Sequence, residues 1–117
     1  MTELSNLRIF VCTVPITMSL SFDALMGAAQ QTFDQDPLSG HLFVFFNRQR
    51  DRIKILFWDA DGFCIWYKRL EAGLFQMPTV TEGRPGVELT CCQLNRLLGG
   101  QDLKSGRRRR WYRRRVV

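Results

Sequence analysis

Basic side chains dominate the parts of this sequence that could do chemistry, and they gather in two stretches. The first is a short polar loop between apolar runs, with its cations at Arg48, Arg50, Arg52 and Lys54. Guanidinium groups grip phosphate oxygens with paired N–H donors, so this loop could straddle a nucleic-acid backbone. The alternative is a solvated hairpin in which Asp51 partly neutralises its neighbours. Lys68 and Arg69 either extend this basic face or protect an edge strand by their charge.

The second stretch is the C-terminal tail, residues 104–117, which carries a charge of +8 without any acid. The other 103 residues hold nine basic and eleven acidic side chains, a balance of −2. Besides Lys104, the cations of the tail are Arg107, Arg108, Arg109, Arg110, Arg113, Arg114 and Arg115. Arginines neutralise phosphates, and Trp111 or Tyr112 could stack on unpaired bases. The tail therefore predicts nucleic-acid binding; the alternatives are a weakly binding disordered tail or the product of an altered reading frame.

The sequence contains few candidates for a catalytic or metal-binding site. Asp59, Asp61 and Glu88 are the candidates for a two-metal nuclease site, because such sites gather carboxylates around Mg²⁺. Residues 59–62, Asp-Ala-Asp-Gly, have however the composition of a tight turn, and we favour that interpretation. The single histidine, His41, has no Ser or Cys in a nucleophile motif near it. We predict no catalytic residue, no metal and no cofactor, so the chain is not expected to be an enzyme.

Length and composition limit the class of protein. With 117 residues, 45% of them hydrophobic and 24% charged, the chain has the usage of a single globular domain. Its apolar runs stay well below the ~20 residues that span a bilayer, and its first residues lack the pattern of a secretory signal. We therefore expect a cytoplasmic protein without membrane contact. Its four cysteines, without a CxxC pair, are expected to form neither disulfides nor a zinc site.

The first half of the chain predicts two elements. Residues 7–14 are β-branched and aromatic and end at Pro15, which is typical of a strand buried on both faces. Ser21 is a plausible N-cap for a helix whose apolar face follows at helical spacing. That face consists of Phe22, Leu25, Met26, Ala29 and Phe33. Residues 36–40, with a proline and a glycine, end this region.

The middle of the chain predicts an antiparallel meander. Residues 41–46, 53–58 and 63–67 are three apolar strand-like runs joined by short loops. Residues 74–77 are expected to add a fourth short strand that is halted by Pro78. We expect the Phe and Trp side chains of these strands, together with Cys64, to form the core, although Trp58 and Trp66 could alternatively stack on bases.

The last elements follow a connector, residues 79–86. Residues 87–89 are a possible strand fragment, and Thr90 with Gln93 has the spacing of a capping box that starts a helix. Leu94, Leu97 and Leu98 give this helix an apolar stripe. The chain is thus expected to be a small α+β domain over residues 1–103, with a mostly antiparallel sheet and two helices. Residues 104–117 are expected to be a disordered basic tail.

Residues 39–75, SGHLFVFFNRQRDRIKILFWDADGFCIWYKRLEAGLF, resemble the TnpB accessory proteins of the bacterial insertion sequence 66 family, also called Orf2-like proteins. Residues 18–25, 36–38 and 87–90 fit the same pattern, so the resemblance covers about residues 8 to 100. It implies a transposon-encoded helper that works beside a separate catalytic transposase. Members of the family usually carry a basic pair where Ser19 and Leu20 stand, so any DNA contact of that pair is lost or moved here.

These observations together predict a non-catalytic accessory protein of DNA transposition. Its expected partners are DNA, in particular transposon ends, and the transposase subunit of the same element, while the oligomeric state is open. The hairpin and tail cations would hold the DNA phosphates. The alternatives are an assembly factor that binds only the transposase and, less favoured, a metal-dependent nuclease.

Overall fold

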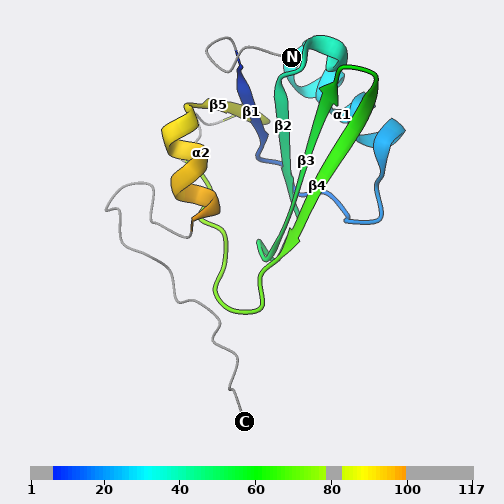
Figure 1. The fold of residues 1–117 in the computed structure, drawn as a ribbon. Helices are drawn as coiled ribbons and strands as arrows, with labels where there is room; N and C mark the ends of the chain where they lie inside the picture. Colours follow the sequence, from blue (N-terminus) through cyan, green and yellow to red (C-terminus); the bar gives the residue numbers. More distant parts are fainter. Residues whose placement is uncertain (1–6, 79–82, 100–117) are drawn as a thin grey trace.

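The computed structural model describes residues 7–78 and 83–99, which form a five-stranded sheet with a helix on either side (Figure 1). In chain order the elements are β1 (Ile9–Cys12), α1 (Phe22–Phe33), the 3₁₀ helix η2 (Pro37–Ser39), β2 (Leu42–Phe46), β3 (Arg52–Asp59), β4 (Gly62–Arg69), β5 (Gly86–Leu89) and α2 (Cys91–Leu98). The strands lie in the order β4-β3-β2-β1-β5. The predicted α+β fold with a mostly antiparallel sheet and two helices is confirmed.

The meander β2-β3-β4 is antiparallel throughout, as predicted. A two-residue turn at Ala60 and Asp61 joins the two long strands β3 and β4, and it requires a positive φ of 53° at Ala60. β1 pairs in parallel with β2 because α1 carries the chain back between them, and β5 then adds to β1 in antiparallel sense. The edges of the sheet are therefore β4 and β5.

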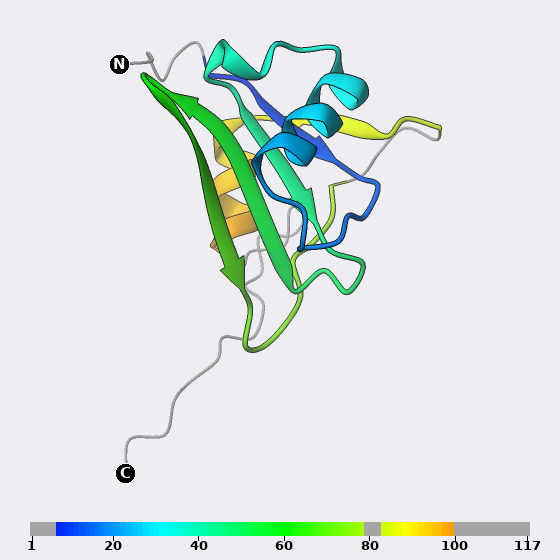
Figure 2. The same cartoon turned by 90° about the vertical axis from the view of Figure 1, so that its right-hand side faces the viewer.

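Each face of the sheet has its own apolar cluster, because side chains alternate between the faces along a strand. Leu25 and Ala29 of α1 pack with Phe43 and Phe45 on one face. The other face is covered by α2, and the members of its cluster are Ile9, Val11, Val44, Phe46, Ile53, Ile55, Phe75, Leu89, Leu94 and Leu97. Figure 2 shows α1 in front of the sheet and α2 behind it. β1, between these two layers, is buried on both faces as predicted.

The two helices differ in how they begin. Ser21 is the N-cap of α1 by position, but its side chain makes no capping hydrogen bond, and Phe22 is exposed rather than part of the buried face. α2 has the predicted capping box: Gln93 N–H donates to Thr90 Oγ1 at 3.1 Å, and Thr90 N–H donates to Gln93 Oε1 at 2.9 Å. This satisfies two N–H groups at the helix start.

The prediction of a fourth strand at residues 74–77 is wrong. The segment crosses the end of the sheet instead of pairing along it, and Phe75 anchors it by packing against Phe46 with the ring centroids 5.7 Å apart. The expectation that the strand tryptophans belong to the core is also wrong for Trp66, which is exposed, while Trp58 and Cys64 are partly buried. The core positions of the sheet are occupied by phenylalanines, among them Phe43, Phe45 and Phe46.

Two other predictions fall outside the described residues: most of the connector, at 79–82, and the whole tail at 104–117. Within the described ranges, none of the helices has the length and apolar character that crossing a bilayer requires. All four cysteines are free thiols.

Candidate nucleic-acid interface

Asn47 sets the shape of the loop between β2 and β3. It is buried, and its Oδ1 accepts hydrogen bonds from the backbone N–H groups of Asp51 (3.1 Å) and Arg52 (3.0 Å). Its Nδ2 donates to Asp51 Oδ1 at 2.6 Å and to Gln49 Oε1 at 3.3 Å. The Asp51 carboxylate is therefore bound to a neutral amide inside the loop, and among the described residues it forms no ion pair with the neighbouring arginines.

Arg50 occupies the tip of this loop in the left-handed region, with φ 62°. A residue other than glycine costs about 1 kcal/mol there and keeps this conformation only where the surroundings hold it. Here Arg50 N–H donates to the Asn47 carbonyl (3.2 Å), and the Arg50 carbonyl accepts from Phe75 N–H (2.7 Å). Leu70 N–H also donates to the Asp51 carbonyl at 2.7 Å. The segment 70–75, which overlaps the wrongly predicted strand 74–77 at Leu74 and Phe75, thus braces the basic loop.

Lys54, predicted with the loop cations, has a different position. Its side chain is buried on the α1 face, and Nζ donates to the carbonyls of Met18 (2.7 Å) and Leu20 (2.8 Å). The same ammonium lies 4.9 Å from the centroid of the Tyr67 ring, in cation–π distance. Lys54 therefore fastens residues 17–20 to the sheet, and its donors are directed at backbone oxygens rather than at a ligand.

Tyr67, which the sequence did not single out, lies between the basic residues. It is opposite Lys54 in the β3-β4 register, and its hydroxyl accepts a hydrogen bond from Arg52 Nη1 at 3.2 Å. Although two cations contact it, 46% of the residue is exposed. A signal was present in the sequence, because the two-residue turn at 60–61 fixes the register and thereby places Tyr67 beside Lys54.

A groove of about 720 Å³ opens between the loop and the segment that precedes α1. Its walls are residues 15–19, residues 47–49 and the side chains of Asp51, Arg52 and Tyr67. The hydroxyls of Thr17 and Ser19, 3.1 Å apart, add polar atoms on the wall facing the arginines. The groove is therefore lined mainly by hydrogen-bonding groups, and Arg48 and Arg52 give it a positive charge.

The remaining predicted cations of the body lie on β4. Arg69 is opposite Arg52 in the register and forms an ion pair with Glu71, Nη2 to Oε1 at 2.8 Å, which reduces the repulsion between the two guanidinium groups. Lys68 points to the opposite face of the sheet, because side chains alternate along a strand. Arg48, Arg50, Arg52 and Arg69 thus share one end of the sheet, whereas Lys54 and Lys68 do not belong to this group.

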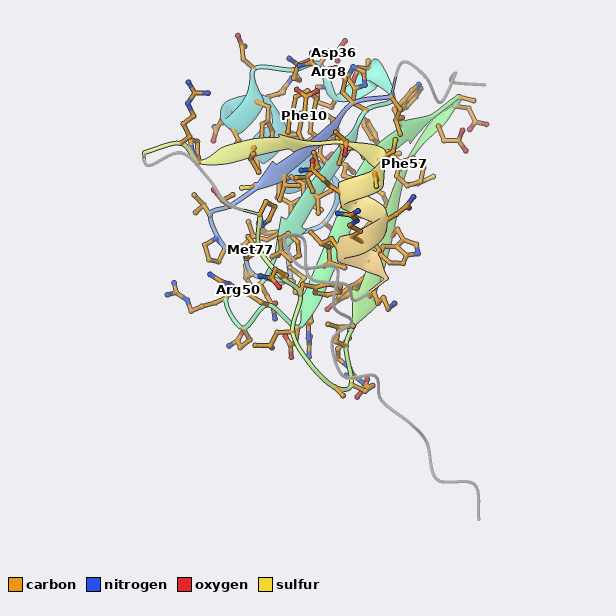
Figure 3. All side chains as sticks on the ribbon, turned by 90° about the vertical axis from the view of Figure 1, so that its left-hand side faces the viewer. Arg8, Phe10, Asp36, Arg50, Phe57 and Met77 are labelled. Atoms are coloured by element: carbon orange, nitrogen blue, oxygen red, sulfur yellow. The ribbon has the colours of Figure 1, made fainter. Side chains whose placement is uncertain are left out.

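Acidic side chains occupy the opposite end. Asp59 and Asp61 flank the β3-β4 turn, as the turn interpretation predicted, and eight-residue strands place them about 23 Å from the Arg52 end. Figure 3 shows Arg50 at one end of the sheet and Asp36 at the other end, where Arg8 also lies and is paired with Glu88. In the described part of the chain, arginines therefore gather at one end of β3 and β4, and aspartates gather at the other end.

Glu88 is separated from Asp59 and Asp61 by the full width of the sheet. It forms a two-pronged ion pair with Arg8, with N–O distances of 2.9 and 2.8 Å, and this contact lowers the pKa of its carboxyl. His41 Nδ1 accepts a hydrogen bond from Arg8 N–H at 3.0 Å, and burial together with the Arg8 charge lowers the pKa of the imidazole. Among the residues that the structure describes, no three His, Cys, Asp or Glu side chains are grouped as metal ligands would be.

The seven tail arginines lie outside the described residues, so the structure places only the body cations.

Comparison with known proteins gives one family. A family model described as IS66 Orf2 like protein, TnpB, matches residues 7–108. Two similar proteins come from Sinorhizobium fredii (strain NBRC 101917 / NGR234). "Uncharacterized protein y4hO" is 33% identical over 97 residues, 83% of either chain, and "Uncharacterized protein y4jC" is 33% identical over 78 residues, 67% of either chain. No solved structure matches the chain at a significant level.

Proposed function

The chain belongs to the IS66 Orf2-like TnpB family and is thus an accessory protein associated with an insertion sequence, and from this premise we propose that it holds DNA for a separate transposase. In this proposal the basic loop between β2 and β3 contacts DNA phosphates through Arg48, Arg50 and Arg52. The tail adds sequence-independent attraction. The protein itself supplies no reactive group, and it acts in the cytoplasm, where transposase and DNA meet.

The observation that carries the proposal concerns the ion-pair partners of the loop arginines. The ion pairs of the described residues are Arg8–Glu88 and Arg69–Glu71, so neither pair involves the loop. The one acid within the loop, Asp51, is bonded to Asn47. Guanidinium groups held on a braced loop without a carboxylate partner are suited to phosphate oxygens, since binding does not first have to break an ion pair.

The polarity of the body supports the same orientation. DNA phosphates attract the arginine end and repel the end that carries Asp36, Asp59 and Asp61, so the molecule approaches DNA with its loop first. A nuclease role is disfavoured, because Asp59 and Asp61 belong to a turn at one edge of the sheet and Glu88 is neutralised by Arg8 at the other. Mg²⁺-dependent cleavage of supercoiled DNA that disappears in Asp59→Asn would contradict the non-catalytic role.

The test is duplex binding of the full chain with its loop charges removed. Arg48→Gln and Arg50→Gly are combined, because glycine accepts the left-handed conformation at position 50 and the fold should be kept. The affinity for a fluorescently labelled transposon-end duplex, measured by anisotropy in 50 mM salt, should fall about tenfold, as expected for two lost phosphate contacts.

Arg96→Gln is the matched control, since Arg96 is an exposed arginine on α2, on the other side of the sheet. It should change the affinity less than twofold. If the loop variant and Arg96→Gln bind as tightly as the natural sequence, or if they lose the same amount, the loop does not hold DNA.

A second function is favoured by the edge strand β4. Within the described residues β4 pairs only with β3, and Trp66 is 41% exposed on it, so a transposase segment could dock there without DNA. Capture of purified transposase should then persist in high salt and without residues 104–117, and it should be lost in Trp66→Ala. Capture that depends on DNA or on low salt would leave only the first function.

A further inference from the structure

The Tyr67 ring is held in place before any ligand arrives. Its hydroxyl accepts the hydrogen bond from Arg52 Nη1, and the Lys54 ammonium lies over one face of the ring at 4.9 Å from the centroid. Lys54 is fixed in turn by the carbonyls of Met18 and Leu20. A side chain anchored at both its polar tip and one face loses little freedom when a ligand binds to the remaining face.

The free part of Tyr67 belongs to the groove. The residue is 46% exposed and lines the groove beside Arg52, while the Lys54 ammonium lies over one face of its ring. A groove of about 720 Å³ lies within the range of about 300–1,000 Å³ that is typical of sites for small organic groups. An aromatic face next to an arginine is the combination that binds single-stranded nucleic acid, because the ring stacks on a base and the guanidinium takes the phosphate.

We propose that this groove binds an unpaired nucleotide of single-stranded DNA, with its base on Tyr67 and its phosphate on Arg52. The inference rests on the proposed function and deepens it by naming the form of DNA. Within a duplex both faces of a base are covered by neighbouring bases, so Tyr67 can stack only where the strand is open or a nucleotide is turned out. Arg48 and Arg50, nearer the tip of the loop, contact phosphates of either form.

Trp66 provides an internal control. It precedes Tyr67 on β4 and is exposed to a similar extent, 41%, but its side chain points to the α2 face of the sheet. A general affinity of exposed aromatics for bases would involve both residues, whereas the groove involves Tyr67 alone.

The experiment measures the affinities of the full chain for a labelled 12-nucleotide oligo(dT) and for a duplex of the same length. All proteins carry Trp111→Ser and Tyr112→Ser, so that the aromatics of the tail do not contribute. Tyr67→Leu should weaken oligo(dT) binding about tenfold, in line with the loss of one base stacking contact, and should change duplex binding less than twofold. Tyr67→Phe should keep most of the affinity, and Trp66→Leu should match the starting protein.

A second probe does not depend on the folding of any variant. An oligonucleotide of the same length with abasic sites keeps every phosphate but offers no base, so it should bind the starting protein about tenfold more weakly than oligo(dT) and bind Tyr67→Leu equally. Equal affinity of the starting protein for both oligonucleotides, or equal losses in Tyr67→Leu and Trp66→Leu, would overturn the inference. The proposed function would survive that outcome as long as Arg48→Gln with Arg50→Gly still weakens duplex binding.

Discussion

Lys54 is the residue whose role differs most between sequence and structure. A lysine two positions after a run of arginines reads as one more loop cation, but the strand begins at Arg52, and alternation then points Lys54 into the sheet toward α1. There its ammonium replaces water with two carbonyls and the Tyr67 ring. Its place in the molecule is structural, as a bridge between residues 17–20 and the sheet.

Lys54→Met should therefore lower stability rather than phosphate binding. The Met18 and Leu20 carbonyls lose their donor, which should cost about 2 kcal/mol in the free energy of unfolding measured by urea denaturation. Arg48→Met, at an exposed position, should stay within about 0.5 kcal/mol of the natural sequence. The salt dependence of DNA binding should be the same with Lys54→Met as without it; a shallower dependence would mean that Lys54 contacts phosphate after all.

Asn47 and Tyr67, which the sequence did not single out, act through contacts that form only in the folded chain. Asn47 reads as an ordinary loop residue, and only the folded loop shows that it satisfies two backbone N–H groups and binds the Asp51 carboxylate. Tyr67 gains its position from β3, fifteen residues or fewer away, through pairing that alternation and the tight turn determine. The exposure of Arg48 and Arg50, by contrast, could be predicted from their polar neighbours alone.

Elements with local signals were predicted well. The capping box of α2 lies within four residues, and the β3-β4 turn is set by its Asp-Ala-Asp-Gly composition. The segment 74–77 has the composition of a strand, but Phe75 is buried against Phe46 and its N–H donates to the Arg50 carbonyl, so the segment crosses the sheet end. Composition predicts that such a segment is buried, whereas tertiary packing determines whether it pairs.

Gly86 controls how closely α1 approaches the β5 edge. A Cβ atom on Gly86 would meet the ring of Phe33, which already packs against Phe10 with the centroids 5.2 Å apart. Gly86→Ala should therefore destabilise the protein by about 1–3 kcal/mol in thermal or urea unfolding. The ring is the obstacle, so Gly86→Ala in a Phe33→Leu background should cost at least about 1 kcal/mol less.

Gly62→Ala is the matched control for this prediction. It is also a strand glycine, but a Cβ atom there would have open space around it, so alanine should be neutral or slightly stabilising. If Gly62→Ala and Gly86→Ala have equal effects, or if Phe33→Leu gives no relief, the close approach of α1 does not limit this position.

At the scale of the whole molecule, the contacts of Arg8 with His41 and Glu88 make the free energy of unfolding depend on pH. Burial, followed by the Arg8 charge, lowers the pKa of His41 below the ordinary value of about 6.5, and its Nδ1 can accept the Arg8 N–H only when the imidazole is neutral. Below pH 6.5 the unfolded chain takes up a proton that the folded protein does not, so stability falls as pH falls toward the lowered pKa. The lowered pKa of Glu88 acts in the same direction at more acidic pH.

His41→Gln should remove the first part of this dependence. Between pH 7.5 and pH 5.5 the melting temperature of the natural sequence should fall more than that of His41→Gln, while at pH 5.0 and below both should decline as carboxyls such as Glu88 become protonated. An equally steep decline of both proteins between pH 7.5 and 5.5 would assign the effect to other groups.

The charge pattern of the whole chain separates general attraction to DNA from placement on it. The tail carries +8 and the rest of the chain −2, so the tail should supply most of the sequence-independent affinity, and the loop arginines should supply the part that depends on a folded surface. Each phosphate contact contributes about −0.9 to the slope of log K against log salt concentration for duplex DNA. Measuring DNA affinity over one series of salt concentrations therefore gives the number of phosphate contacts made by the tail and by the loop.

Arg48→Gln with Arg50→Gly should make that slope shallower by about 2, whether the tail is intact or has its eight cations changed to glutamine. Neutralising the tail alone should make the slope shallower by as much as about 7 and still leave a residual slope, which the loop variant should lower by about 2. The two changes should add, because the loop is braced by Asn47 and Phe75. A slope that vanishes on neutralising the tail alone would mean that the folded body follows the tail to DNA without contacting it.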